Sequence, residues 1–348
     1  MRFKNGFLKI IFIAAALALV AACGRNNNEA ADDNGYGNGH IADAPYIPSE
    51  TLVVGGGIAD YDHGQLSMYY INVMNEYLYG RLPFSYRELY AAHWIQDVLI
   101  DMGHPAQNVE IQTFHINDVN ARFFNGGDRD YSQNVILTIP GQSAQTIVVG
   151  AHYDIVYGVA GASDNASGVA LLLESAWRML HTQNYYTLVY VFFGAEEIGL
   201  LGADYFVRSL SQSEIDNMLF MVNADVLFEG PYLLYIAGQL TDYSRSDNEL
   251  TQVWDGIASR VGAEHGFDFI PYPNGMYMWM SDHIPFYQRG ITVVFFAGLY
   301  DGDWGFTPRV LHSHRDCAVY IEASWPGKME ENMRAFSLLL EAILLNRY

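Results

Sequence analysis

Apolar residues follow two different spacings along most of the chain. Between residues 64 and 102 they recur at intervals of three and four, which is typical of amphipathic helices. Further on, they form short alternating or continuous runs, which are typical of strands and, where continuous, of the centre of a covered sheet. The segments predicted as strands are 109–114, 134–139, 146–151, 187–193, 219–226 and 291–296.

Helical segments separate these strands. They are predicted at 165–181, 202–210 and 328–345, and the Ser85-x-x-Glu88 pair predicts a capping box at the start of a helix near residue 85. Strands that alternate with helices indicate parallel strands joined by crossover helices on both faces of a sheet. We therefore predict an α/β fold with a mainly parallel, mixed central sheet, in one domain spanning residues 51–348.

The N-terminal segment has the pattern of a targeting sequence. Basic residues precede a 13-residue apolar run at 10–22, which is shorter than the ~20 residues of a membrane-spanning helix and predicts a signal peptide over 1–22. The run ends in Ala-Ala-Cys23, which resembles the lipobox of bacterial lipoproteins. That resemblance implies a lipid anchor on Cys23, outside the cytoplasm at the bacterial cell membrane; an ordinary secretory signal is the alternative. Residues 23–50, rich in Asn, Gly, Asp and Ala, are predicted to be a flexible tether.

Composition and charge limit the partners of the domain. The chain is 51% apolar, so it can bury a sizeable core. Asp and Glu number 39 against 18 Lys and Arg, a formal net charge of −21. This excess would repel a phosphate backbone, so nucleic acid is a poor candidate partner.

Polar residues follow three of the predicted buried strands where each strand ends. They are His152 and Asp154 after the first, Glu196 and Glu197 after the second, and Asp225 near the end of the third. The carboxyl ends of strands in an open α/β sheet form the crevice where ligands bind. Imidazole and carboxylate are ligands that Zn²⁺ favours. The sequence therefore predicts a metal site at this edge of the sheet.

Three further features refine this site. Asp164 lies in a loop of small residues just before a predicted helix, where a carboxylate can cap the helix or bridge two metal ions about 3.5–4 Å apart. Glu196 and Glu197 are adjacent, so one can bind metal while the other faces the substrate as a general base. His312 and His314 offer two more imidazoles, and Asp316 is expected to orient the ring of His312.

The order and spacing of these segments resemble the two-zinc aminopeptidase family. The matching segments are His152–Asp154, Gly161–Asn165, Gly194–Gly202, Asn223–Asp225 and His312–Asp316. This family belongs to a zinc-dependent exopeptidase superfamily that also includes glutaminyl cyclases and the peptidase-like domain of the transferrin receptor. The resemblance covers about residues 64–345 and implies a fold of the zinc-dependent exopeptidase type.

The resemblance also implies a role for each matching residue. His152 and Asp225 would hold one zinc ion, Glu197 and His312 the second, and Asp164 would bridge both, with Glu196 as general base and Asp154 behind His152. The family pattern places the ligand four residues before the aspartate, which selects His312 rather than His314. The peptide bond between Asp164 and Asn165 is often cis in this family.

The implied function is a secreted, membrane-anchored metallo-exopeptidase that removes N-terminal residues from peptides with two Zn²⁺ ions. Asp282, in a segment that resembles cyclases as closely as peptidases, is a candidate for binding the substrate amine. A glutaminyl cyclase is therefore one alternative. A carboxypeptidase, with Arg309 or Arg315 binding a terminal carboxylate, is another. A third alternative is a binding module that keeps the fold without peptidase activity, as in the transferrin-receptor branch. Such a module would lack some of the metal-ligand residues. Leu311 stands where some secreted members have a tyrosine that polarises the scissile carbonyl.

Overall fold

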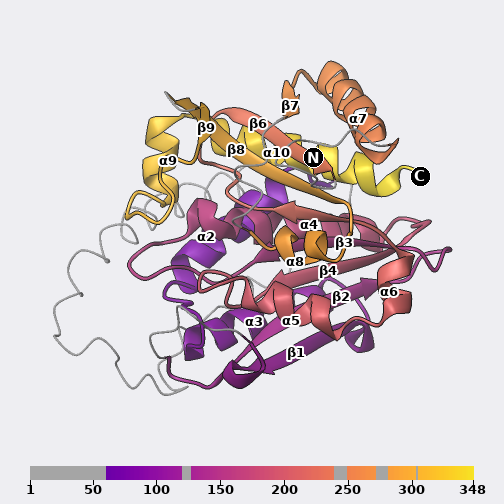
Figure 1. Ribbon diagram of the computed structural model, residues 1–348. Coiled ribbons are helices and arrows are strands. Elements are labelled where there is room, and N and C mark those ends of the chain that lie inside the picture. Colours follow the sequence, from indigo (N-terminus) through magenta and orange to yellow (C-terminus); the bar gives the residue numbers. More distant parts are fainter. Residues whose placement is uncertain (1–59, 120–126, 239–248, 272–280, 303–304) are drawn as a thin grey trace, which may run out of the picture.

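The computed structural model describes residues 60–348, except for 120–126, 239–248, 272–280 and 303–304. Its described strands form one nine-stranded sheet in the order β1-β2-β4-β3-β5-β8-β6-β7, with β9 paired to β8 (Figure 1). The strands are β1 Val109–His115, β2 Tyr131–Ile139, β3 Thr146–His152, β4 Thr187–Phe193, β5 Met218–Ala224, β6 Tyr232–Gly238, β7 Phe269–Pro271, β8 Val293–Gly302 and β9 Gly305–Thr307. The predicted signal peptide, Cys23 and the tether lie outside the described residues.

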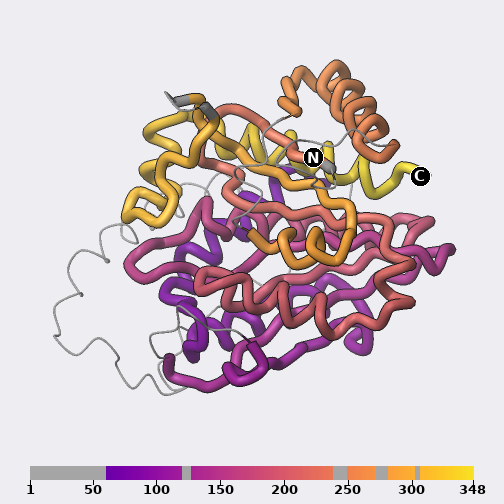
Figure 2. The backbone as a smooth tube through the Cα atoms, in the orientation of Figure 1, coloured from indigo at the N-terminus to yellow at the C-terminus, as the bar shows by residue number. Residues whose placement is uncertain are grey.

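The centre of the sheet is parallel and its flanks are mixed. β3 pairs in parallel with β4 and β5, and β5 pairs in parallel with β8. β1 and β2 are antiparallel at one side, and β6 runs antiparallel to β8 at the other. Figure 2 shows that the earlier part of the chain builds one end of the sheet and the later part builds the other. The predicted α/β fold is confirmed.

Helices cover both faces of the sheet. They are α2 Gln65–Tyr77, α3 Tyr86–Asp101, α4 Gly168–Leu180, α5 Leu201–Ser209, α6 Gln212–Asn217, α7 Glu249–His265, α8 His283–Gln288, α9 Ala318–Ser324 and α10 Lys328–Leu345. Single 3₁₀ turns lie at Ala106–Asn108 and Ile116–Asp118, and a π-helical turn at Ala162–Ser167 precedes α4. None of the helices in the described ranges is both long enough and apolar enough to cross a membrane.

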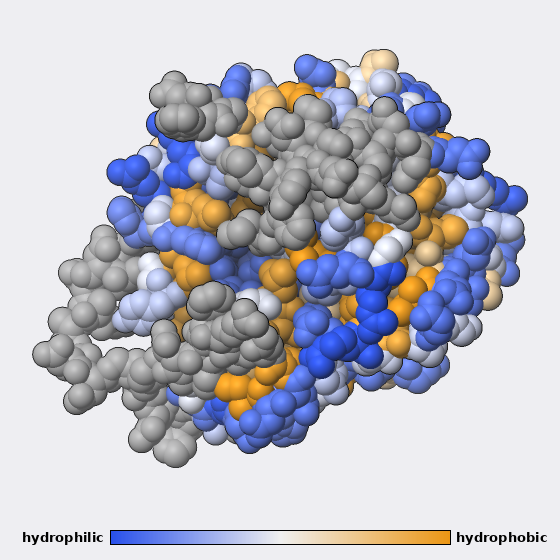
Figure 3. All heavy atoms as spheres, in the orientation of Figure 1, coloured by the Kyte–Doolittle hydropathy of each residue, from blue (hydrophilic) through white to orange (hydrophobic). Residues whose placement is uncertain are grey.

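Two buried apolar clusters correspond to the two faces. The larger takes side chains from α2, α3, α4, α7 and α10, and the smaller takes them from α5 and α8. In Figure 1 the helices α5, α6 and α8 lie in front of the sheet. In Figure 3 hydrophilic side chains predominate on the outer surface around α5 and α6, as expected for helices whose other face packs on a sheet.

Only half of the predicted capping box at Ser85 is present. The Ser85 hydroxyl accepts a hydrogen bond from the backbone N–H of Glu88 at 3.0 Å, as predicted. The Glu88 carboxylate, however, accepts from the N–H of Phe84 at 2.8 Å and from that of Ala195 at 3.0 Å. The reciprocal bond to Ser85 is therefore absent, because Glu88 is turned toward the end of β4.

Candidate metal and active site

Strand register brings the predicted site residues to one edge of the sheet. His152 is the last residue of β3 and lies opposite Phe193, the last residue of β4. On the other side of β3, Gly150 lies opposite Asn223 of β5. The residues that follow β4 and β5 therefore emerge beside His152, as expected for neighbouring parallel strands.

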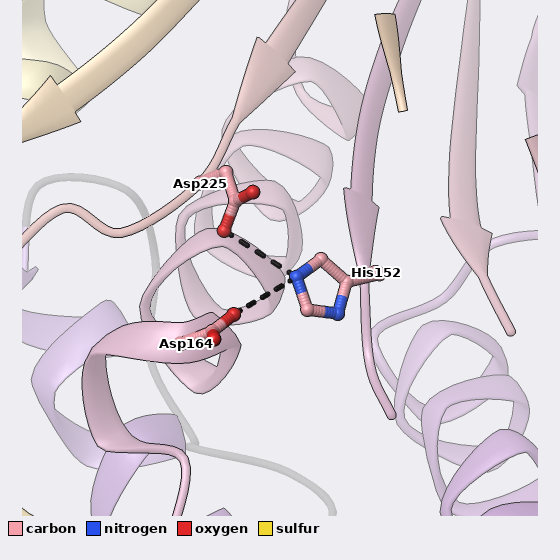
Figure 4. A group of neighbouring side chains, drawn as sticks. All are labelled: His152, Asp164 and Asp225. Carbon is pink, nitrogen blue, oxygen red and sulfur yellow. Dashed lines mark ion pairs between the residues drawn. The ribbon is translucent and has the colours of Figure 1, made fainter. Parts of the chain in front are cut away.

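A first group of ligand atoms surrounds the ring of His152. Its Nε2 lies 3.1 Å from Asp164 Oδ1 and 3.4 Å from Asp225 Oδ1 (Figure 4). All three residues are buried. Each residue offers one potential ligand atom, and these three atoms all lie within 4.8 Å of one another. The group is therefore suited to a metal ion.

A second group shares Asp164 with the first. His312 Nε2 lies 3.0 Å from Glu197 Oε2 and 3.3 Å from Asp164 Oδ2. Asp164 therefore presents one carboxylate oxygen to each histidine. This is the arrangement that a carboxylate bridging two cations requires. His314 belongs to none of the ligand groups found in the part of the chain that the structure describes.

Asp154 links the ends of β3 and β4. Its Oδ1 lies 3.6 Å from His152 Nδ1 and accepts the N–H of Glu196 at 3.0 Å. Its Oδ2 accepts the N–H of Glu197 at 3.1 Å. The position behind His152 is the one that the sequence resemblance implies. Its contacts with both glutamates could not be inferred from spacing.

Asp316 has a different partner from the one predicted. Its Oδ1 accepts the N–H of Ser163 at 2.7 Å and its Oδ2 accepts that of Asp164 at 3.1 Å. It therefore holds the loop that carries Asp164, and the prediction that it orients the His312 ring is wrong. A tight turn after His312, closed by a hydrogen bond from Asp316 N–H to Ser313 O, directs the side chain to that loop.

Close packing fixes the loop before α4. The Asp164–Asn165 peptide bond is cis, as the resemblance predicts. The Asn165 amide donates to Ala224 O at 2.9 Å and its Oδ1 accepts the N–H of Gly168, also at 2.9 Å. A Cβ at Gly168 would lie 2.2 Å from Ala224 O, so only glycine permits this approach to β5.

Several buried oxygens at this edge lack hydrogen-bond partners among the described residues. They are Glu197 Oε1, Asp225 Oδ1 and both carboxylate oxygens of Asp282. Buried polar atoms in folded proteins nearly always have a partner. The donor set of imidazole nitrogens and carboxylate oxygens fits Zn²⁺, and divalent cations would satisfy the oxygens of the ligand residues.

Burial and mutual charge shift the pKa values of these groups. Burial raises the pKa of Glu197 to about 8, and those of Glu196 and Asp282 well above their usual range. Hydrogen bonds to Asp164 and Glu197 raise the pKa of His312 to about 10. Burial opposes ionisation of Asp164 too, but its two histidine partners lower its pKa below the usual range. The site is therefore a buried excess of acidic groups, which favours bound cations.

Arg81 is a fully buried side chain beside this site, and no sequence pattern predicts its role. It donates hydrogen bonds to the carbonyls of Tyr153, Ala160 and Gly161. Burial lowers its pKa to about 10, while carboxylates including Asp316 favour its charge. A lone arginine outside any motif gives no signal in a sequence, because only the fold shows that it joins the end of β3 to the loop before Asp164.

Glu229 and Ser281 were also missed, and both support ligand residues. Glu229 Oε2 accepts the N–H groups of Arg309, at 2.7 Å, and Val310, just before His312. The Ser281 hydroxyl donates to Asp225 Oδ2 at 2.7 Å. Both act on residues distant in sequence, so spacing could not identify them.

Leu311 offers no polar group at the position before His312. Its partly buried side chain packs against the smaller apolar cluster. Arg309 and Arg315 both stack on aromatic rings, with guanidinium carbons 4.8 Å from the ring centre of Tyr300 and 5.5 Å from that of Tyr320.

A sequence model of Peptidase family M28 matches residues 134–337, which include every predicted metal ligand. Aminopeptidase YwaD of Bacillus subtilis (strain 168) is 34% identical over 149 residues, which are 42% of this chain and 30% of that protein. A protein of Mycobacterium tuberculosis named "Probable lipoprotein aminopeptidase LpqL" is 38% identical over 98 residues, 28% of this chain and 20% of that protein. The matching segments span less than a third of these relatives.

Solved structures show the same fold. BSAP, a zinc aminopeptidase from Bacillus subtilis, superposes with a TM-score of 0.67 at 16% identity, covering 82% of this chain and 96% of that one. A glutaminyl cyclase of Tannerella forsythia superposes with a TM-score of 0.60 at 17% identity, covering 82% and 99%. At these identities the likeness concerns the fold alone.

Proposed function

Since the chain belongs to Peptidase family M28, we propose that it is a metallo-aminopeptidase that removes N-terminal residues from peptides with two zinc ions. The observation that carries the proposal is the carboxylate of Asp164, which faces His152 with one oxygen and His312 with the other. The names of the sequence relatives and of the zinc aminopeptidase with the same fold support it.

The five predicted ligands divide between the two ions. His152 and Asp225 would hold one, Glu197 and His312 the other, and Asp164 would contact both. When bound, the ions would lower the pKa of a water molecule and polarise the scissile carbonyl. A binding module of the same fold would lack some of these residues, and all five are present here.

Glu196 is the general base of the proposal. It is 7% exposed, comes three residues after the end of β4, and lies in a ligand group with His152 and Glu197. Burial raises its pKa above the usual range. A buried carboxylate in this position can accept a proton from a water molecule and return it to a leaving group. Glu196 would take the proton of the attacking water and deliver it to the leaving amine.

Asp282 is the proposed anchor for the free α-amine of the substrate. It is fully buried, and neither of its oxygens has a hydrogen-bond partner among the described residues. A substrate ammonium group would supply both the missing donors and the missing positive charge. The carboxypeptidase alternative is less favoured, because the sequence relatives and the zinc enzyme with the same fold are named aminopeptidases.

A test with three peptides separates aminopeptidase, cyclase and carboxypeptidase. We expect zinc-loaded protein to shorten an unblocked peptide stepwise from its N-terminus and to leave the N-acetylated peptide intact, as followed by mass spectrometry. Loss of ammonia from a peptide with N-terminal Gln, without shortening, would instead establish the cyclase that the Tannerella forsythia structure makes a candidate. Shortening of the acetylated peptide from its C-terminus would establish the carboxypeptidase.

The proposal includes a lipid anchor at Cys23. The sequence around Cys23 and the name of the Mycobacterium tuberculosis relative support it. In cell fractionation, we expect the wild-type protein in the membrane fraction and Cys23→Ala outside it. Wild-type protein released in a form that begins before Cys23 would exclude the anchor.

A further inference from the structure

Carboxylates hold three consecutive backbone N–H groups at the turn that carries the proposed base. Asp154 accepts those of Glu196 and Glu197, at 3.0 and 3.1 Å. Glu88 Oε1 accepts that of Ala195 at 3.0 Å. Asp154 follows β3 and also contacts His152. Glu88 comes from α3, and no metal-ligand group found among the described residues includes it.

The surroundings of Glu88 make it a rigid acceptor. It is fully buried, and its Oε1 also accepts the Ser132 hydroxyl at 2.7 Å. Its Oε2 accepts the Phe84 N–H at 2.8 Å and lies 3.3 Å from Arg129 Nη2. Four donors surround the two oxygens, so the side chain has one defined position.

The backbone at Ala195 needs such an acceptor. Its φ of 53° lies in the left-handed region, which costs a residue with a Cβ about 1 kcal/mol or more. The next residue is Glu196, so the direction of its side chain depends on this conformation. Ala195 is itself buried, and solvent cannot replace Glu88 as the partner of its N–H.

We propose that Glu88 is a positioning residue that fixes the direction of Glu196 through the Ala195 N–H. This inference rests on the proposed role of Glu196 as general base. A displacement of about 1 Å at a reacting group can lower a rate about 100-fold. Loss of the Glu88 acceptor should therefore reduce turnover more than substrate affinity.

Glu174 provides a matched control for the structural cost of changing a buried glutamate. It is fully buried, pairs with Arg178 at 3.1 Å, and accepts the N–H groups of Gly64 and Ser67 at 2.8 and 2.9 Å. It also accepts a serine hydroxyl, that of Ser337, at 2.6 Å. It lies on α4, and these partners all lie outside the turn after β4.

The experiment compares Glu88→Gln with Glu174→Gln in the zinc-loaded full chain, using an unblocked peptide. An amide keeps the shape of the carboxylate but cannot accept at both ends. We expect both variants to lose unfolding free energy and to retain zinc. Only Glu88→Gln should lower kcat, by about 10- to 100-fold, with little change in KM. Equal kcat values per folded molecule in the two variants would overturn the proposal.

Amide hydrogen exchange supplies a readout that does not depend on activity. We expect faster exchange at residues 195–197 in Glu88→Gln and unchanged exchange there in Glu174→Gln. Unchanged exchange in both would overturn the positioning role. If the two variants differ in exchange as expected but the wild-type protein has no peptidase activity, the proposed function is overturned and the positioning role is not.

Ser132→Ala is the variant to use if Glu88→Gln does not fold. It removes one hydrogen-bond donor from the same Oε1 and should give the same changes in kcat and exchange, but smaller ones. Wild-type kcat and wild-type exchange in Ser132→Ala would reject the proposal.

Discussion

Two buried polar clusters differ in how their charges are compensated. Around Glu174, between α2, α4 and α10, the carboxylate oxygens accept from backbone N–H groups, serine hydroxyls and the guanidinium of Arg178. At the ends of β3, β4 and β5, oxygens of Glu197, Asp225 and Asp282 have no such partner among the described residues. Burial of acidic groups is thus common to both clusters, and missing partners distinguish the functional one.

The charge balance of the clusters differs in the same way. Glu174 faces one guanidinium, that of Arg178, at 3.1 Å. The strand-end cluster combines six carboxylates with the nearby Arg81 and the two ligand imidazoles; the carboxylates are those of Asp154, Asp164, Glu196, Glu197, Asp225 and Asp282. Uncompensated buried charges are costly, so this cluster is arranged for cations and for a substrate ammonium group.

The largest effect is expected when the strand-end cluster loses its base. In Glu196→Gln we expect kcat to fall by about 10²- to 10⁴-fold, because the amide cannot accept a proton. Zinc content, measured by elemental analysis, should stay at the wild-type level. As a control, Glu197→Gln should lose zinc, because Glu197 lies in the ligand group of His312. Zinc loss in Glu196→Gln with retention in Glu197→Gln would mean that the two roles are reversed.

The opposite result is expected in the compensated cluster. Glu174→Ala leaves Arg178 buried without its carboxylate, so we expect the unfolding free energy to fall by about 3–5 kcal/mol. Activity and zinc content per folded molecule should remain at wild-type values. Chemical denaturation and peptidase assays on the same preparation measure both. A selective loss of zinc would show that the two clusters are coupled.

Features set by local pattern were predictable from the sequence. The strand 187–193 was predicted with its observed bounds, because a continuous apolar run is local information. His152, Glu196 and Asp225 could be placed at one edge because parallel neighbours align their carboxyl ends. That they meet depends on the strand order, in which β3 lies between β4 and β5.

Features set by contacts between distant segments were not predictable. Glu88 fits a capping box by spacing, but its carboxylate reaches the end of β4. Asp316 has the spacing of a group that orients His312, but it binds the loop of Asp164. β6 was missed although it is largely apolar, and it is held by antiparallel pairing to β8 far along the chain. In each case the deciding partner is remote in sequence.

A smaller effect is expected at His104, whose buried Nε2 also lacks a partner among the described residues but lies outside the ligand groups. Burial lowers its pKa to about 4. The unfolded chain therefore binds more protons than the folded one between about pH 6.5 and 4, and stability is lost as pH falls through this window. From pH 7 to 5 we expect His104 to account for about 2 kcal/mol of that loss.

Denaturation at both pH values tests this expectation. His104→Gln cannot titrate, so the difference in its unfolding free energy between pH 7 and pH 5 should be smaller than that of the wild type by about 2 kcal/mol. Parallel losses in the two proteins would assign the acid sensitivity to other groups. The result shows whether an unpaired buried atom that lies outside the strand-end cluster contributes to stability.

The smallest effect is expected for a solvent-exposed ion pair on the protein surface. Arg208 and Asp204 on α5 pair at 2.9 Å, but their side chains are 46% and 41% exposed. Exposed pairs of this spacing contribute about 0.3–0.5 kcal/mol, because solvent screens the charges and both side chains lose freedom. Arg208 also donates to Asp118 O at 2.8 Å, so we expect Arg208→Ala to reduce the unfolding free energy by less than about 1 kcal/mol. Denaturation should show a small difference at low salt and a still smaller one at 1 M salt, because salt screens an exposed pair. A loss as large as that of Glu174→Ala would mean that pairing, rather than burial, determines what a charged residue contributes in this protein.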